Sequence, residues 1–262
     1  MPHAALSCFT RHFTRHFTRH FPRHFPRHFA HRFTRCLTRA FAASLLLLLA
    51  LAPACASAQA SPEIGKTAAN LMAVLREAHG ANKQDGTLTP VGTVTAKVDG
   101  KAVEMRPAWF DYLGDMQVHF VFDSPKATAP ATMEDLARLK LTPEEALKLA
   151  VTNMKRVYGK PWAEPLAGDL MSVASRAPDY NSSYFLDRDF WEAQLKAHPE
   201  GLVAAPIKRG GLAWVPAYNT KEVGALRVSV SRLHAAGGRM RISSALYLYK
   251  DGRWTVFQPP QG

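Results

Sequence analysis

A basic turn flanked by glycine is the stretch of this sequence best suited to holding a ligand. Lys208 and Arg209 follow one apolar run, and Gly210 and Gly211 lead into another at 212–215. Bare backbone N–H groups and a guanidinium can together hold an anion. Hairpin turns also use glycine and surface charge without binding anything. The motif therefore predicts a small-anion site, with an ordinary turn as the alternative. A second Gly-Gly basic loop at 235–241 counts as a separate turn, because the sequence does not show whether the two meet.

A polar stretch at 181–183 is the second candidate. Asn181 and Ser182 join Lys208 and Arg209 as the predicted ligand-binding residues. A cysteine-independent hydrolase would use either Ser183 as its nucleophile or an acidic pair. It lies in no Gly-x-Ser-x-Gly elbow, and a capping or turn serine is the simpler interpretation. The sequence therefore predicts no catalytic residue.

Three acids at 187–192 could offer oxygen ligands to a divalent cation. Asp187, Asp189 and Glu192 lack the glycine-bearing loop of a calcium site, and Arg188 lies among them. Their expected role is to balance the positive end of a helix that begins there. His119, on an alternating strand, is expected to be structural rather than catalytic. We therefore predict neither a metal site nor a cofactor.

Three helices are expected around these residues. A Ser61-Pro62 start, apolar positions from Ile64 to Leu75 and a stop at Gly80 predict the first. A capping box with proline at 142–145 predicts the second, running to Tyr158-Gly159. The third begins near Asp187 and ends by 198–201.

Alternating or short apolar runs predict the strands. They lie at 91–98, 102–105, 116–123, 202–205, 212–215, 226–230, 246–249 and 254–257. Asp-Gly turns at 99–100 and 251–252 join two pairs into hairpins. The segments 124–132 and 161–177 are expected to be connections. Without regular βαβ spacing, the pattern predicts an α+β fold: a mixed, largely antiparallel sheet with about three helices packed on it. The five tryptophans are expected to be core or interface anchors.

Residues 1–58 are typical of a leader. An apolar segment at 45–52 is too short to span a bilayer, which needs about 20 residues, and it is followed by Ala56-Ser57-Ala58. We predict a signal peptide at 39–58, cleavage near Ala58, and a periplasmic or secreted chain that begins at or near Gln59. The residues before Cys55 match a lipoprotein signal poorly, so lipid anchoring at Cys55 is the weaker alternative.

Residues 11–38 repeat Arg-His-Phe followed by Thr, Pro or Ala. Regularly spaced histidine could bind metal or act on membranes. Because prolines interrupt the repeat and it precedes the predicted cut, translated repetitive DNA ahead of the true start is the better interpretation.

The leader also distorts the composition. Removing its eight arginines from the 33 basic residues leaves 25 against 21 acidic residues, a net charge of +4 instead of +12. The predicted mature chain is then not expected to carry the basic surface that nucleic-acid binding requires. All three cysteines lie in the leader, so the mature chain is expected to have no disulfide, thiolate zinc site or cysteine nucleophile. Residues 59–262 are predicted to form one domain without a transmembrane helix.

Several stretches together resemble a known domain family. They are the strand 116–123 ending in Asp123, the helix start 142–150 with Asn153, and the stretches 181–186, 203–209 and 247–252. Over residues 116–257 this pattern resembles the YtpQ-like family, to which no activity is assigned. The resemblance implies a fold and not a reaction.

These observations predict an exported domain that binds a small anionic ligand or an envelope protein. A cysteine-independent hydrolase is one alternative. An envelope assembly or secretion accessory protein is another, for which exposed aromatic edge strands would be the sign.

Overall fold

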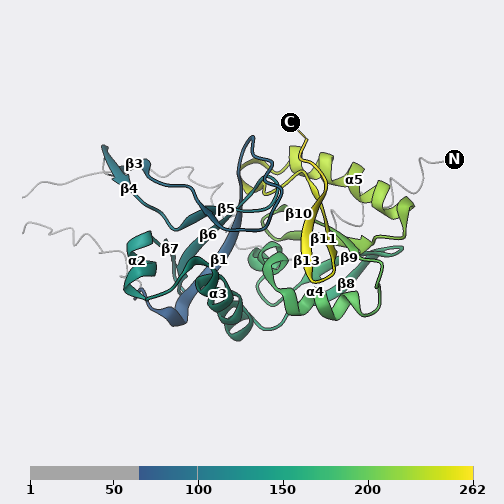
Figure 1. The fold of residues 1–262 in the computed structure, drawn as a ribbon, viewed down its shortest axis with the longest axis horizontal. Coiled ribbons are helices and arrows are strands. Elements are labelled where there is room, and N and C mark those ends of the chain that lie inside the picture. Colours follow the sequence, from purple (N-terminus) through teal and green to yellow (C-terminus); the bar gives the residue numbers. More distant parts are fainter. Residues whose placement is uncertain (1–64, 99, 262) are drawn as a thin grey trace, which may run out of the picture.

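Two antiparallel sheets organise the part of the chain that the computed structural model describes, residues 65–98 and 100–261. The leader, its repeat, the cleavage position near Ala58 and Cys55 lie outside these residues. The first sheet has the order β1-β6-β5-β2, with β7 also paired to β6. The second has the order β13-β12-β10-β11-β9-β8, and β3 and β4 form a separate hairpin. Figure 1 shows the two sheets side by side. The α+β class with largely antiparallel pairing is confirmed.

The strands have the following bounds. In the first sheet they are β1 (Leu71–Glu77), β2 (Thr89–Pro90), β5 (Trp109–Asp111), β6 (Met116–Asp123) and β7 (Thr128–Pro130). The hairpin consists of β3 (Val94–Val98) and β4 (Lys101–Met105). In the second sheet they are β8 (Trp162–Ala167), β9 (Leu170–Ala174), β10 (Leu202–Lys208), β11 (Gly211–Pro216), β12 (Leu246–Lys250) and β13 (Arg253–Gln258). Strands β7, β8 and β9 lie where the sequence predicted connections, and that prediction was wrong.

The helices are α2 (Met133–Arg138), α3 (Pro143–Tyr158), α4 (Arg188–Leu195) and α5 (Thr220–Ala235), with 3-10 turns η1 (Ala68–Asn70), η2 (Pro178–Leu186) and η3 (Gly238–Met240). The predicted capping box of α3 is confirmed, because Glu145 N–H donates to the Thr142 hydroxyl and Thr142 N–H donates to the Glu145 carboxylate. Helix α4 begins where the sequence predicted the third helix. Among the described residues, no helix is both long and apolar enough to cross a membrane.

The helix predicted for 61–80 is wrong over its described part. Residues 71–77 are strand β1, paired along its length with β6. Leu71, Ala73 and Leu75 are buried on one face of the strand, and Met72 is buried at the start of the other face. The consecutive buried residues 71–73 hide the two-residue period of a strand, and helical spacing also fits this run.

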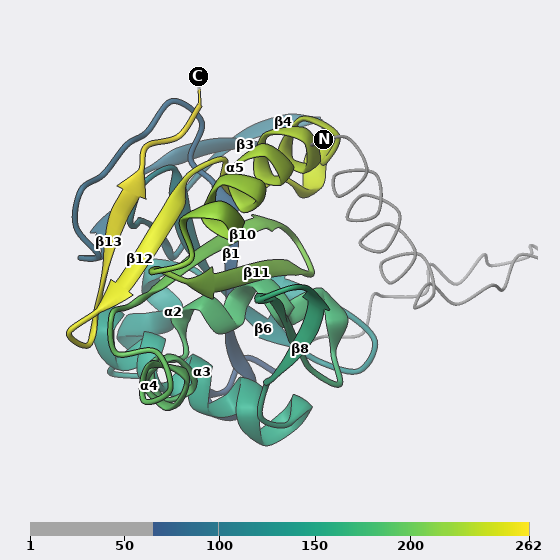
Figure 2. The same ribbon diagram turned by 90° about the vertical axis from the view of Figure 1, so that its right-hand side faces the viewer.

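The strand predicted for 226–230 is also wrong, because it lies within α5. Leu226 and Val230 are buried while Val228 between them is exposed, which is the four-residue spacing of one helical face. Asn219 caps the helix by accepting a hydrogen bond from Glu222 N–H. The buried face of α5 packs on strands β10 and β11, which the helix crosses in Figure 2. Packing on the sheet outweighs the strand preference of the valines.

One large hydrophobic core draws on both sheets. It includes Leu71 and Phe120 from the first sheet, Trp214 and Tyr247 from the second, and Phe185 from η2. A smaller core lies between the other face of the second sheet and α5.

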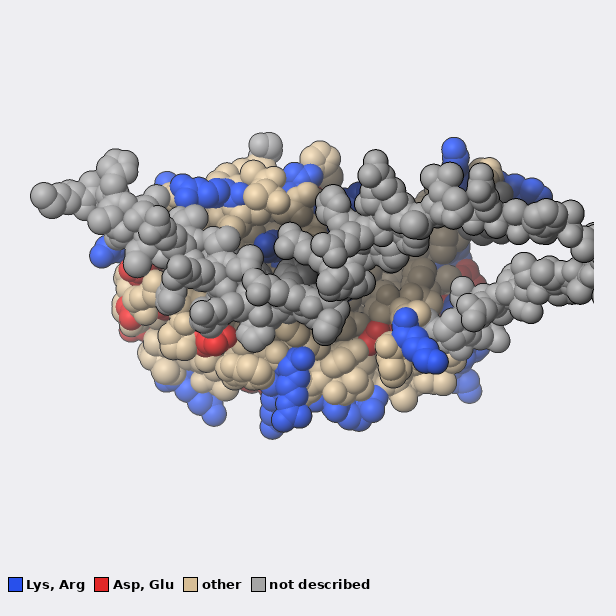
Figure 3. Space-filling model, turned by 180° about the vertical axis from the view of Figure 1, so that it is seen from behind, with Lys and Arg blue, Asp and Glu red and all other residues tan. Residues whose placement is uncertain are grey.

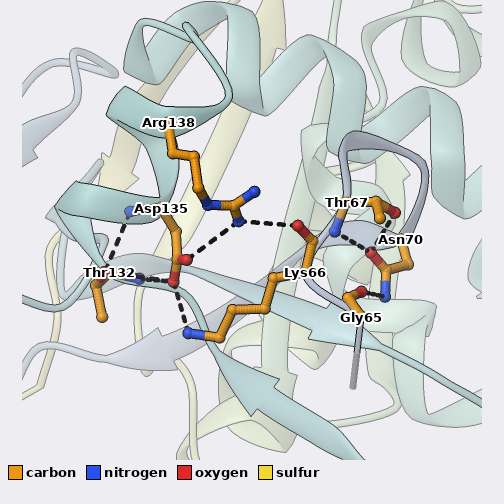
Figure 4. Close-up of polar contacts among 7 residues, drawn as sticks. All are labelled: Gly65, Lys66, Thr67, Asn70, Thr132, Asp135 and Arg138. Carbon is orange, nitrogen blue, oxygen red and sulfur yellow. Dashed lines mark hydrogen bonds and ion pairs between the residues drawn. The ribbon is translucent and has the colours of Figure 1, made fainter. Parts of the chain in front are cut away.

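The start of the described chain is fastened to α2 through one carboxylate. Asp135 Oδ2 lies 2.9 Å from Lys66 Nζ and accepts from Thr132 N–H, while Asp135 Oδ1 lies 3.3 Å from Arg138 Nη2. The same Arg138 nitrogen donates to the Lys66 carbonyl at 2.8 Å. Figure 4 shows Lys66 and Arg138 reaching Asp135 from different directions. Residues 66 and 138 are thereby joined on one side of the first sheet.

Candidate functional site

The predicted basic turn joins β10 to β11, as the sequence implied. Gly210 has φ +76, and a Cβ at this position would lie 2.9 Å from the Pro178 carbonyl oxygen. Both the positive φ and the close approach require glycine. The turn is therefore packed tightly against the first residues of η2.

The two Gly-Gly basic loops, predicted as separate turns, lie against each other. Lys208 forms an isolated antiparallel bridge with Arg241. Arg209 N–H donates to the Met240 carbonyl at 2.8 Å, and Ile242 N–H donates to the Ile207 carbonyl at 3.1 Å. These backbone bonds fix the basic turn in place. They gather cationic residues from two loops that are about 30 positions apart in the sequence.

The side chain of Arg209 forms an ion pair at the surface. Its Nη2 lies 2.9 Å from Asp179 Oδ2, and the two side chains are 44% and 72% exposed. Such an exposed pair contributes only about 0–1 kcal/mol. An incoming anion could therefore share or replace Asp179 at little cost.

Arg76, on β1, is the functional candidate that the sequence analysis missed. It is half-buried, and its Nη1 donates to the Leu75 carbonyl at 2.9 Å. Burial lowers the pKa of Arg76, and the positive charge of Arg209 lowers it further. No carboxylate in the described part of the chain pairs with this guanidinium. A half-buried guanidinium that feels the positive charge of a second arginine is an arrangement that an anion stabilises.

Glu77 fastens the second basic loop beside Arg76. Its Oε1 lies 3.1 Å from His234 Nε2, and its Oε2 lies 3.3 Å from Arg241 Nε. Neither contact has hydrogen-bond geometry. Both contacts lie within ion-pair distance, and Coulomb attraction does not depend on hydrogen-bond geometry.

Asn181 and Ser182, predicted to line the site from a polar loop, lie instead in η2 and are buried. Asn181 Oδ1 accepts from Ser175 Oγ at 2.7 Å. Asp179, in the same 3-10 turn, is the residue that reaches Arg209. Of the four predicted ligand-binding residues, Lys208 and Arg209 thus lie together, whereas Asn181 and Ser182 point into the protein.

The other candidates are engaged elsewhere. Ser183 is only 1% exposed, so its hydroxyl has no direct access to a substrate. Asp187 and Asp189 both bind Lys155 Nζ, at 2.9 and 2.7 Å. Within the described ranges, no group of three or more histidine, cysteine or acidic side chains could hold a metal ion. On the visible part of the face shown in Figure 3, Lys and Arg side chains lie in several separate groups.

His119 lies on the partly exposed face of the first sheet, near Arg76. Its ring stacks on Trp109 with centroids 4.2 Å apart and planes 6° from parallel. Its Nε2 lies 2.9 Å from Gln117 Oε1, and Gln117 Nε2 donates to Asp111 at 2.8 Å. Burial and the charge of Arg76 lower the pKa of His119 to about 3, so the ring is neutral at physiological pH.

Comparison with known proteins gives no relative from which a role could be transferred: the chain matches no protein-family model, no curated protein and no solved structure.

Proposed function

We propose that the protein is an exported binding domain that holds a small anion between Arg76 and Arg209. The observation that carries the proposal is the half-buried guanidinium of Arg76, which pairs with no described carboxylate, while its neighbour Glu77 is paired with Arg241 in the loop that binds the Arg209 backbone. A carboxylate or phosphate would supply the missing negative charge and accept several of the N–H donors. Export is proposed from the leader sequence alone, and the resemblance to the YtpQ-like family stays a prediction.

The turn geometry supports the same site. Gly210 brings the β10–β11 turn against η2, and the Gly237–Arg241 loop binds the Arg209 backbone, so both elements that carry positive charge are held by hydrogen bonds. A binding site built on fixed backbone loses less conformational entropy when it takes its ligand. We propose no reaction, because Ser183 is buried and the acids at 187 and 189 are paired with Lys155.

Thermal unfolding of the full chain tests the proposal. Phosphate or acetate, added at fixed ionic strength with chloride as the reference, should raise the melting temperature because an anion that binds the folded state stabilises it. Arg209→Ala should abolish the rise. Arg227→Ala, which removes an exposed arginine on α5, should keep it. An unchanged melting temperature of the wild-type protein with both anions would reject the anion site.

One observation favours binding of a protein as a second candidate function. Strands β8 and β13 are the two edges of the second sheet, and each carries an aromatic side chain that is 47% exposed, Trp162 and Phe257. Exposed edge strands can pair with an extended segment of another chain. Recovery of an envelope protein by the wild-type domain, and its loss when proline replaces Val256 on β13, whose N–H faces away from β12, would support this candidate. Equal recovery by both would count against it.

A further inference from the structure

The partly exposed face of the first sheet places the stacked rings next to the proposed anion site. Cross-strand partners on this face fall into two adjacent rows. One row holds Arg76, Gln117 and Asp111, and the next holds Val74, His119 and Trp109. Neighbouring rows on one face of a sheet lie about 7 Å apart. Because neighbouring strands lie about 4.8 Å apart, His119 is then about 8 Å and Trp109 about 12 Å from Arg76, a separation that the arginine side chain and a ring-bearing molecule together span.

The second row is apolar in spite of its histidine. His119 is neutral and gives part of its hydrogen-bonding capacity to Gln117. Trp109 and His119 are both only partly buried, and Val74 beside them is partly buried as well. Parallel rings at this separation present a combined aromatic surface that is not cationic. The row is suited to the uncharged part of a ligand and not to a second anionic group.

The charges on this face also give the ligand a direction. Asp111 is the acid at the β5 end of the first row, where Gln117 holds it. Arg76 lies at the β1 end, and Glu77 next to it is paired with Arg241 in the loop that binds the Arg209 backbone. An anionic group is attracted to the β1 end and repelled from the β5 end. The rest of the molecule must then extend over β6 and β5.

We propose that the ligand is a planar ring that carries an anionic group, with the anion on Arg76 and Arg209 and the ring against Trp109 and His119. This inference rests on the proposed anion site. It adds a class of ligand, aromatic acids and other ring-bearing anions, and it assigns to Trp109 and His119 the recognition of the ring. A bare inorganic anion would contact the two arginines and leave the Trp109–His119 pair without a partner.

A comparison of 2-naphthoate with acetate tests the inference, because the two share a carboxylate and differ in the ring. Calorimetric titration of the full chain should give a dissociation constant about tenfold lower for 2-naphthoate, from burial of the ring and its aromatic contacts. Trp109→Ala should remove this preference by weakening the binding of 2-naphthoate. Trp162→Ala, which deletes an exposed tryptophan on β8, should keep the preference. Arg209→Ala should weaken both acids.

The outcomes separate the two proposals. Equal affinities for the two acids in the wild-type protein would overturn the ring-bearing ligand and leave the anion site standing. Binding of neither acid would overturn both. A preference for 2-naphthoate that survives in Trp109→Ala would place the ring elsewhere and overturn the inference.

A measurement on the wild-type protein covers the case in which Trp109→Ala does not fold. The indole N–H resonance of Trp109, assigned by its disappearance in the conservative variant Trp109→Phe, should move when 2-naphthoate is added. Acetate should leave it nearly in place. An unmoved resonance at saturating 2-naphthoate would also overturn the inference.

Discussion

Glu77 Oε1 lies 3.1 Å from His234 Nε2, so a carboxylate on the first sheet meets a side chain at the end of α5, the helix that packs on the second sheet. The same carboxylate lies 3.3 Å from Arg241 Nε, in the loop that binds the Arg209 backbone. Glu77 therefore links β1, which carries Arg76, to the loop that binds the Arg209 backbone, and so joins the two elements of the proposed anion site.

Glu77→Gln should loosen this connection. It keeps the size of the side chain but removes the charge, so the free energy of unfolding should fall by about 1 kcal/mol and acetate affinity should fall with it. Chemical denaturation and calorimetry measure the two effects. Glu200→Gln, at an exposed carboxylate, is the matched control and should change neither. Equal behaviour of the two variants would show that Glu77 does not hold the site.

Gly114 should be irreplaceable. It has φ +63, and a Cβ there would clash with Tyr247 Oη. Tyr247 Oη in turn lies 3.0 Å from the buried Asp115 carboxylate, so it cannot move without breaking that contact. Gly114→Ala should lower the free energy of unfolding by about 3 kcal/mol or more. Gly224→Ala, within α5 and with open space around it, should instead raise it by up to about 1 kcal/mol. Denaturant melts of both variants test the contrast, and a mild effect at Gly114 would contradict the packing.

Replacing Lys155 should reduce the free energy of unfolding far more than replacing Asp189, one of its two partners. Asp187 is 2% exposed and Asp189 is 82% exposed, although both bind the same ammonium group. Lys155→Met would leave the Asp187 carboxylate buried without its counter-charge, at a cost of about 3 kcal/mol. Asp189→Ala removes only an exposed partner and should cost less than about 1 kcal/mol. Comparable losses of stability in the two variants would contradict this assignment.

Alkaline pH should unfold the protein through its buried tyrosines. Burial raises the pKa of Tyr112 to about 12, against an ordinary value of 10.0. Burial likewise raises the pKa of Tyr184 to about 12. Between these values the unfolded chain loses protons that the folded chain keeps, so stability is complete below pH 10 and falls as the pH rises towards 12. Tyr112→Phe should flatten this decline, which unfolding curves at a series of pH values measure. An equally steep decline in the variant would show that Tyr112 does not contribute.

The accuracy of the sequence predictions depended on where the signal for each element lies. Helix α3 and the hairpin β12–β13 were predicted because a capping box and an Asp-Gly turn are local signals. Strand β1 and helix α5 were assigned to the wrong class because each is determined by what it packs against.

The candidate site likewise combines a part with a local sequence signal and a part that depends on packing. The β10–β11 turn could be found from Lys208 to Gly211, because the glycines and the charges are adjacent in the sequence. Arg76 was missed because the sequence predicted a helix over 71–77. The run 71–75 is apolar throughout and lacks the alternation that marks a strand. Arg76 and Arg209 are more than 130 positions apart in the sequence. Their relation in space depends on how the two sheets pack, which no local sequence pattern predicts.

The most direct test of the anion site is the dissociation constant of acetate for the full chain and for Arg76→Leu, Arg209→Ala and the double variant. If one anion contacts both guanidiniums, each single change should weaken binding by about tenfold or more. The double change should cost less than the two single effects combined, because the first already removes a shared contact. Unaltered acetate affinity in both single variants would contradict the account.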